Sequence, residues 1–382
     1  MKIRSAILLI LLSNFALFVY LLVWVGKNEP HSYQIDGVNY DSESAPFVDP
    51  DVKQAIVPKG ELLARVVMIG DAGDPAEINA ENLAMLRHWT QEHLQKTVAL
   101  YLGDNVYSYG FEPDKQSRSE AILTAQLDAG GARNIVIPGN HDWGHSHGNF
   151  VERVVAQQNF VDAWPGAEFY PRNGCPGPEV ITLVEEDKAL GRPVRLIMLD
   201  TQWMLIPLER PECDGVSFYQ VMNRLEALLE QYQDDMLIVA SHHPIRTTGP
   251  HGGFQRGMIR RIWQSLMGSQ GTLGKPLYEA VMGDYSKAIG SVRPLIYVAG
   301  HEHSLQVHRG GDVAEYMLVS GAGAVKHVNV VTAAEDTLFA HAHAGFSVLD
   351  FLQTDAGRVL VLRMVEAGKG EVFAMVLAAT DS

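Results

Sequence analysis

The sequence has few basic side chains for its length. Its 382 residues include 30 lysine and arginine residues against 45 aspartate and glutamate residues, which gives a formal net charge of −15 at pH 7. A broad nucleic-acid-binding surface requires clustered lysine and arginine, so this balance argues against nucleic acid as a partner. A small anionic substrate remains compatible with it, because bound cations reverse the sign of the electrostatic field locally.

Cysteine is also scarce, and the sequence has no internal repeat. The two cysteines, Cys175 and Cys213, both lie in segments rich in proline and glycine. They can form one disulfide if the domain is exported, and otherwise they are two free thiols. The 35 glycine and 18 proline residues follow no repeat, which favours a loop-rich α/β enzyme over a fibrous or disordered chain. The hydrophobic content of 47% suffices for a sizeable core.

The N-terminal segment lacks both charge and a cleavage pattern. After the basic residues Lys2 and Arg4, residues 5–25 carry no charge over about one membrane-spanning length. A cleaved signal peptide usually has a shorter apolar core that ends in small residues, whereas this run ends in bulky ones such as Trp24. We therefore expect a transmembrane anchor at residues 1–26 that holds the rest of the chain outside the cytoplasm, in the periplasm or the extracellular space. Cleavage of the segment would instead give a secreted protein.

The rest of the chain divides into a linker and one domain. Residues 27–60 are polar and lack periodicity, which predicts a tether, and residues 61–380 form the expected catalytic domain. Within it, short apolar runs alternate with amphipathic helical patterns, for example at residues 78–94 and 221–232, and this alternation predicts an α/β fold. The runs lie at residues 62–69, 98–102, 134–137, 194–199, 236–240 and 295–299. Four later runs without long helices between them predict a mainly antiparallel closing portion, at residues 316–319, 346–351, 359–364 and 372–376.

Residues able to bind metal follow five of the six apolar runs. In open α/β folds, ligands bind at the carboxyl ends of the strands. Glycine precedes the candidate ligand in four of the five segments, where we expect a sharp turn to require a residue without a Cβ. The segments are Gly70-Asp71-Ala72-Gly73, Gly103-Asp104-Asn105-Val106-Tyr107, Gly139-Asn140-His141-Asp142, Ser241-His242-His243-Pro244 and Gly300-His301-Glu302-His303.

The number of donors indicates two ions. One such segment is weak evidence, because Gly-Asp after a strand is commonly a turn and a single histidine there is more often structural. Five in the same structural place are hard to explain as turns, and seven donors are too many for one transition ion. Two ions about 3.5 to 4 Å apart that share a carboxylate are the usual arrangement for in-line phosphoryl displacement. The predicted ligands are Asp71, Asp104, Tyr107, Asn140, His242, His301 and His303.

Tyr107 narrows the choice of metal. A phenol has an ordinary pKa of about 10, so binding as a phenolate near neutral or acidic pH requires a strongly Lewis-acidic ion. Hard oxygen donors suit ferric iron better than zinc. Taken alone, Tyr107 would be interpreted as a packed aromatic side chain. Together with the other six predicted ligands, Tyr107 predicts a ferric ion.

The ordered motifs Asp-x-Gly, Gly-Asp-x-x-Tyr, Gly-Asn-His-Asp, Val-x-x-His and Gly-His-x-His resemble those of the purple acid phosphatases, in the calcineurin-like metallophosphoesterase superfamily. The small, tartrate-resistant type is the most similar, since it also carries a histidine nine residues beyond Val-x-x-His, matched by His251. Its Leu-Gln and Ser-Gly-Ala-Gly motifs are matched by Leu305-Gln306 and residues 320–323. The resemblance covers residues 62–324. It departs at Ala72, where the small-type enzymes often carry an aromatic residue.

The resemblance implies both a fold and a division of the ligands. The implied fold is an αββα sandwich, in which two packed mixed β-sheets are flanked by helices. A ferric ion is implied at Asp71, Tyr107 and His303. A divalent ion, which in this family is iron, zinc or manganese, is implied at Asn140, His242 and His301, and Asp104 would bridge the two.

Two histidines are candidates for catalysis. The resemblance makes His141 the acid that protonates the leaving oxygen, with His251 assisting it or gripping the phosphate. A protonated imidazole is a natural donor at acidic pH. The two cations would lower the pKa of bound water enough to supply hydroxide as the nucleophile. The structural alternative for His141 is support of Asp142 or of a neighbouring ligand.

These expectations combine into a membrane-anchored, exported acid phosphatase that hydrolyses small phosphate monoesters. The nearest alternative is a phosphodiesterase or nucleotide pyrophosphatase on the same two-metal site. An alternative from another class is a non-catalytic surface protein that keeps the fold and binds metal. The sequence carries no readable code for the physiological substrate.

Overall fold

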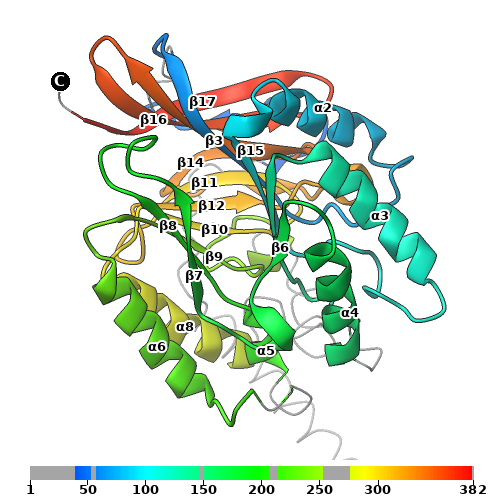
Figure 1. Ribbon diagram of the computed structural model, residues 1–382. Helices are drawn as coiled ribbons and strands as arrows, with labels where there is room; N and C mark the ends of the chain where they lie inside the picture. Colours follow the sequence, from blue (N-terminus) through cyan, green and yellow to red (C-terminus); the bar gives the residue numbers. More distant parts are fainter. Residues whose placement is uncertain are drawn as a thin grey trace, which may run out of the picture.

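The structure is a computed structural model, and it describes residues 39–52, 57–145, 150–206, 211, 213–252 and 276–380. Two mixed β-sheets pack against each other, and helices cover their outer faces (Figure 1). This arrangement confirms the predicted α/β fold of two mixed sheets with flanking helices. The expected anchor at residues 1–26 and much of the linker lie outside the described residues. Within the described ranges, no helix has the combined length and apolar character that a membrane crossing requires.

The first sheet has seven strands in the order β17-β16-β15-β3-β4-β5-β6. Its parallel half consists of β3 (Glu61–Ile69), β4 (Thr97–Leu102), β5 (Arg133–Ile137) and β6 (Ala167–Phe169). Its antiparallel half consists of β15 (Gly345–Thr354), β16 (Gly357–Glu366) and β17 (Gly370–Ala379). The C-terminal strands therefore extend the sheet that the first strand of the domain begins, which bears out the antiparallel closing portion for three of the four predicted runs.

The second sheet has eight strands in the order β2-β14-β11-β12-β10-β9-β8-β7. Its parallel strands are β8 (Val194–Met198), β9 (Met236–Ala240), β10 (Ile296–Ala299) and β12 (Tyr316–Ser320). Its antiparallel strands are β2 (Phe47–Val48), β7 (Glu179–Val184), β11 (Leu305–Arg309) and β14 (Thr337–His341). The run at residues 316–319, expected in the mainly antiparallel portion, forms β12, which pairs antiparallel with β11 but parallel with β10. A separate two-stranded ladder joins β1 (Asn39–Tyr40) to β13 (Val331–Thr332).

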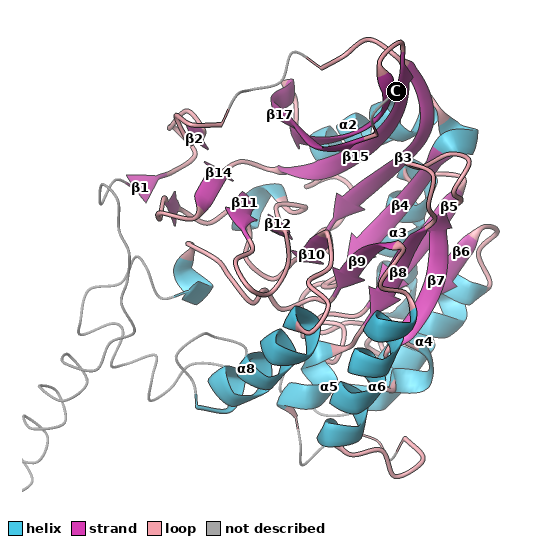
Figure 2. Ribbon diagram, turned by 90° about the vertical axis from the view of Figure 1, so that its left-hand side faces the viewer, coloured by secondary structure: helices cyan, strands magenta, loops and turns pink. Residues whose placement is uncertain are grey.

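Helices cover the outer face of each sheet. Figures 1 and 2 show two groups, one on the β3–β6 side and one on the β8–β10 side. The first group contains α2 (Ala80–Gln91), α3 (Gln116–Ala129) and α4 (Phe150–Asp162). The second contains α5 (Thr201–Leu205), α6 (Phe218–Gln231) and α8 (Pro276–Gly290).

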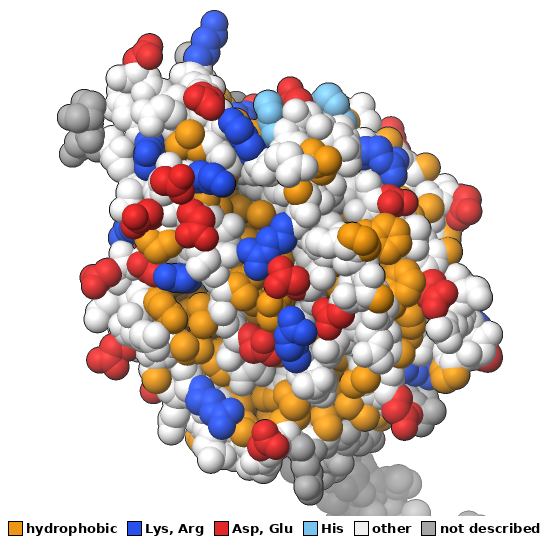
Figure 3. Space-filling view, viewed as in Figure 1, with side chains coloured by type: hydrophobic (Ala, Val, Ile, Leu, Met, Phe, Trp, Pro, Cys, Tyr) orange, Lys and Arg blue, Asp and Glu red, His pale blue; other side chains and the backbone are white. Residues whose placement is uncertain are grey.

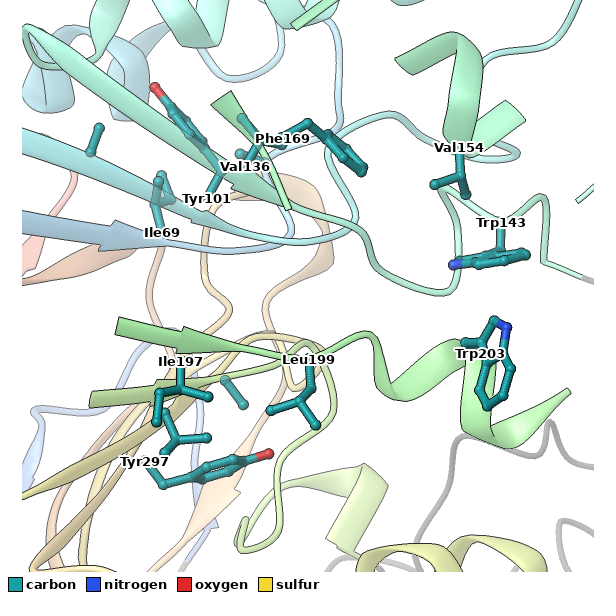
Figure 4. Close-up of a cluster of buried hydrophobic side chains, with 14 of the residues drawn as sticks. Ile69, Tyr101, Val136, Trp143, Val154, Phe169, Ile197, Leu199, Trp203 and Tyr297 are labelled. Atoms are coloured by element: carbon teal, nitrogen blue, oxygen red, sulfur yellow. The ribbon is translucent and has the colours of Figure 1, made fainter. Parts of the chain in front are cut away.

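The central strands are buried on both faces. Along β3, Val66 and Met68 pack in the core between the sheets, while Val67 and Ile69 pack in the core beneath the helices. Parallel strands buried in this way are continuous hydrophobic runs, which is why they were visible in the sequence. The helix-covered core contains residues of both sheets and includes Trp143 and Trp203 (Figure 4).

Two further features bear on the sequence predictions. The structure joins Cys175 and Cys213 in a disulfide with a Cα–Cα distance of 5.6 Å, so the alternative of two free thiols does not hold here. On the face shown in Figure 3, acidic and basic side chains are interspersed, and no broad basic area is visible.

Candidate metal centre

The five predicted segments meet at one edge of the sandwich, at the carboxyl ends of β3, β4, β5, β9 and β10. Backbone hydrogen bonds connect their turns. The Asp71 amide donates to the Gly103 carbonyl at 2.9 Å, and the Gly300 amide donates to the His242 carbonyl at 3.0 Å. The two sheets are joined directly where the His301 amide donates to Asp71 Oδ2 at 2.7 Å. The structure thus brings all seven predicted ligands together.

The first group of donors comes from both sheets. Tyr107 Oη lies 3.2 Å from Asp71 Oδ1 and 3.2 Å from His303 Nε2. His303 Nε2 in turn lies 3.3 Å from Asp71 Oδ1. Atoms that share one ion through bonds of about 2.0 to 2.2 Å are separated by about this distance. The three donors therefore fit around one cation.

The second group has the same spacing. Asn140 Oδ1 lies 3.0 Å from His242 Nε2 and 3.0 Å from His301 Nδ1, and those two nitrogens are 3.3 Å apart. Asp104 Oδ1 lies 3.4 Å from His242 Nε2. Asp104 also forms a group with Asp71 and His242 in which the donor atoms lie within 4.8 Å of one another. Its carboxylate therefore reaches both sets of donors.

Backbone carbonyls orient two of the imidazoles. His242 Nδ1 lies 2.8 Å from the Leu102 carbonyl, and His303 Nδ1 lies 2.8 Å from the His327 carbonyl. A carbonyl oxygen can only accept, so each Nδ1 carries the hydrogen. In the neutral ring, Nε2 then presents its lone pair to the other donors. Metal-binding histidines are commonly fixed in this way.

Three of the predicted ligands have a left-handed backbone conformation. The φ angles are 60° at Asp71, 54° at Asp104 and 65° at His301. Non-glycine residues are uncommon in this region, where such strain costs on the order of 1–3 kcal/mol per residue and clusters at functional sites. Three such residues in one turn cluster indicate that the fold holds these side chains against a local preference.

The glycines before the predicted ligands are required for two different reasons. Among the four, Gly103 alone has a positive φ, at 90°. At the other three, the requirement is close approach of neighbouring atoms. A Cβ added at Gly139 would lie 2.3 Å from Asp104 Oδ1, and one at Gly300 would lie 2.7 Å from Asp71 Oδ2. At Gly70, a Cβ would lie 3.0 Å from the Gly300 Cα.

The buried carboxylates give the site a negative electrostatic potential. Burial lowers the pKa of the His242 imidazole, but the Asp104 carboxylate overcomes this effect and the result is about 10. Burial raises the pKa of the Tyr107 phenol well above its ordinary value, and the carboxylates of Asp71 and Asp104 raise it further. The protein groups alone thus hold protons where a metal ligand must lose them. Cations of high charge would compensate this field, so the donor set fits a pair of metal ions.

The two candidate catalytic histidines lie beside different donor groups. The His141 ring lies edge-on to Tyr107, with centroids 4.8 Å apart, and its Nε2 is 3.8 Å from Asp104 Oδ2. The His251 ring lies 4.3 Å from the His301 ring. His141 Nδ1 faces the Ser108 carbonyl at 2.6 Å, which directs Nε2 toward the centre.

Two acidic residues hold the turns in place, and the sequence interpretation assigned them no such role. Asp142 accepts hydrogen bonds from the amides of Asn105, Val106 and Gly139, so it connects the turns after β4 and β5. Glu302 accepts from the His251 amide at 2.8 Å and positions that histidine. Both residues lie inside the motifs that carry the family resemblance, and this position is the sequence signal for their role.

Two further histidines lie at the centre. His243 is buried, and its donor atom lies within 4.8 Å of those of His242 and His301. Its Nδ1 faces Thr201 Oγ1 at 2.8 Å. The His327 ring is 5.4 Å from the Tyr107 ring at the more exposed side of the centre. No motif pointed to His327, because it follows the matched segment.

Comparisons with known proteins identify the family. The family model for calcineurin-like phosphoesterases matches residues 64–305, which is more than half of the chain. A comparison with curated proteins finds no significant match.

Three solved structures are similar to this chain at low sequence identity. GAP50, described as the anchor in the inner membrane complex of Plasmodium, is 17% identical with a TM-score of 0.53, over 84% of this chain and 90% of that chain. A 5'-nucleotidase from Candida albicans is 11% identical with a TM-score of 0.34, over 84% and 52%. Vps29 from Entamoeba histolytica, complexed with zinc, is 13% identical with a TM-score of 0.30, over 82% and 99%. With two facing mixed sheets, candidate metal ligands at the strand ends and the family match, this chain belongs to the calcineurin-like phosphoesterase family.

Proposed function

We propose that this protein is an acid phosphatase of the purple acid phosphatase type, which hydrolyses phosphate monoesters at a dinuclear centre. The observation that carries the proposal is the pair of three-donor groups on either side of Asp104, one of which contains the phenol of Tyr107. Asp71, Tyr107 and His303 would hold ferric iron. Asn140, His242 and His301 would hold iron, zinc or manganese in the divalent state.

The phenol supports ferric iron at the first position. Burial raises the pKa of Tyr107, and the surrounding carboxylates raise it further. The phenol therefore keeps its proton unless a strong Lewis acid displaces the proton. Two oxygen donors and one nitrogen donor also suit a hard ion. When bound, the two cations supply a water of lowered pKa as the nucleophile and neutralise the phosphoryl oxygens.

The histidines supply the proton chemistry. His141 Nε2 faces the centre, and its side chain is 23% exposed, so the alcohol portion of a substrate entering from solvent can reach it. We assign it the role of donating a proton to the leaving oxygen, and His251 the role of contacting the phosphate beside His301. The Ser108 carbonyl fixes the position of His141, and the Glu302 carboxylate fixes that of His251.

Export and membrane attachment belong to the same proposal. The uncharged segment at residues 5–25 follows Lys2 and Arg4, which favours an anchor with the domain outside the cytoplasm. The disulfide between Cys175 and Cys213 supports an oxidising compartment.

A comparison of two substrates tests the proposed activity. With the full-length protein at acidic pH, we expect kcat/KM for p-nitrophenyl phosphate to exceed that for bis(p-nitrophenyl) phosphate by at least about tenfold, which corresponds to about 1.4 kcal/mol of barrier. Faster cleavage of the diester would instead identify a phosphodiesterase. If two metals are bound but neither ester is hydrolysed, the protein is a non-catalytic metal-binding member of the fold.

A further inference from the structure

A second group of metal-binding side chains lies outside the centre described above. It consists of His341, His343 and Glu366, whose donor atoms lie within 4.8 Å of one another. His341 Nε2 is 2.9 Å from Glu366 Oε2, and His343 Nδ1 is 3.4 Å from Glu366 Oε1. The two imidazole rings are stacked, with centroids 4.4 Å apart, and both turn a nitrogen toward the one carboxylate.

The strands fix this arrangement without a ligand. His341 is the last residue of β14, and His343 follows two positions later in the connection to β15. Glu366 is the last residue of β16 and pairs with Gly345, the first residue of β15. A further backbone hydrogen bond of 2.8 Å joins the Ala367 amide to the Ala344 carbonyl. The three donors therefore come from two chain segments. One leaves β14 of the eight-stranded sheet and enters β15, and the pairing of β15 with β16 in the seven-stranded sheet places Glu366 beside it.

We propose that His341, His343 and Glu366 form an additional metal site that binds one divalent cation, with zinc as the best match. Two imidazoles and one carboxylate are a common protein ligand set for zinc, and three protein ligands leave one position for water. The separations of 2.9 and 3.4 Å are close to those expected between ligands of one ion. His343 is 28% exposed, which gives the ion a path from solvent, whereas His341 is buried.

Lys369 competes with a bound cation for the Glu366 carboxylate. Its Nζ lies 3.1 Å from Glu366 Oε2, where its positive charge opposes a cation. The lysine side chain is 60% exposed and can turn into solvent when a metal enters. Removing this charge while keeping all three ligands should therefore strengthen zinc binding, because the carboxylate loses a competing partner.

The position of the site suggests a structural contribution. His341 pairs with Leu305 across β14 and β11, and Leu305 lies two residues beyond His303. An ion at this place would tie the β14–β15 connection to the end of β16, next to the strand that leaves the candidate centre. None of the three residues is among the seven predicted ligands, so the two sites can be tested separately.

Zinc stoichiometry of the full-length protein tests the proposal. We expect the wild-type protein to retain one more equivalent of zinc after equilibrium dialysis than the His343→Ala variant. Zinc affinity at this site should fall by at least about 100-fold in the variant, since loss of a mere partner of a ligand already costs 10–100-fold. The matched control is His88→Ala, which removes an exposed histidine from α2. It should bind as much zinc as the wild type.

Two outcomes would overturn the proposal. One is equal zinc content in His343→Ala and the wild-type protein. The other comes from Lys369→Ala, which keeps every ligand and should bind zinc more tightly at this site than the wild type. Unchanged or weaker zinc binding in that variant would show that the cluster is a hydrogen-bonded network and not a metal site. Both readouts measure binding, so they do not depend on phosphatase activity.

Discussion

Replacing Asp104 with asparagine is expected to lower kcat/KM for p-nitrophenyl phosphate by more than about 100-fold, together with a loss of bound metal. Changing only a hydrogen-bond partner of a ligand commonly costs 10–100-fold, and Asp104 would itself bind both ions. Its carboxylate is buried and lies between the two donor groups. An amide of the same shape can still accept the hydrogen bond that the His141 amide donates at 2.8 Å, so the turn should be preserved.

Metal analysis and steady-state kinetics on the same samples check this expectation. The matched control is Asp128→Asn, which removes an exposed carboxylate from α3 and should leave both quantities unchanged. If Asp104→Asn keeps two metals and near wild-type turnover, Asp104 is not the bridging residue.

Replacing His141 with alanine is expected to reduce kcat for an alkyl phosphate by about 10²- to 10⁴-fold, the usual contribution of general acid–base catalysis, while the metals stay bound. His141 is not among the seven donors, and its Nε2 lies 3.8 Å from Asp104 Oδ2. The loss should depend on the leaving group. An alkyl phosphate releases a strongly basic alkoxide and needs the proton, whereas p-nitrophenolate leaves without one.

The comparison of the two leaving groups separates catalysis from support. We expect a larger deficit in kcat for the alkyl phosphate than for p-nitrophenyl phosphate, and no deficit for either in the control His88→Ala. Equal deficits on both substrates, or loss of metal, would instead assign His141 to holding the turn that contains Asn140 and Asp142.

The sequence predicted the parts of the fold that burial dictates. Strands such as β3 and β9 are covered on both faces, so their sequences are unbroken apolar runs. The polar residues that follow them then stand out, and these are the predicted metal ligands. Asp71 and His301 are 230 positions apart in the chain, and their contact follows from both lying at carboxyl ends of parallel strands.

Other elements left a weaker signal. α3 buries polar side chains, including Ser119 and Gln126, so it has little apolar periodicity to recognise. β11 begins directly after the His301 and His303 segment and contains the buried polar residues Gln306 and His308, so no apolar run marks it. The position of β12 between β10 and β11 depends on contacts between strands, which no local pattern encodes.

The centre also depends on features that a motif cannot reveal. The need for glycine at position 139 arises from atoms of Asp104 and His242, which come from other strands. The roles of Asp142 and Glu302 likewise depend on hydrogen bonds to distant turns. The disulfide needed the structure, because two cysteines in loops do not specify their separation in space.

The metal content and visible spectrum of the purified full-length protein test the central claim most directly. We predict two metal ions per chain at the main centre, at least one of them ferric, and a pink or purple colour from charge transfer between Tyr107 and iron. The Tyr107→Phe variant should lose the colour while His88→Ala keeps it. A protein that binds no metal at the seven donors would contradict the two-metal account, and a colourless protein with bound ferric iron would contradict the assignment of Tyr107.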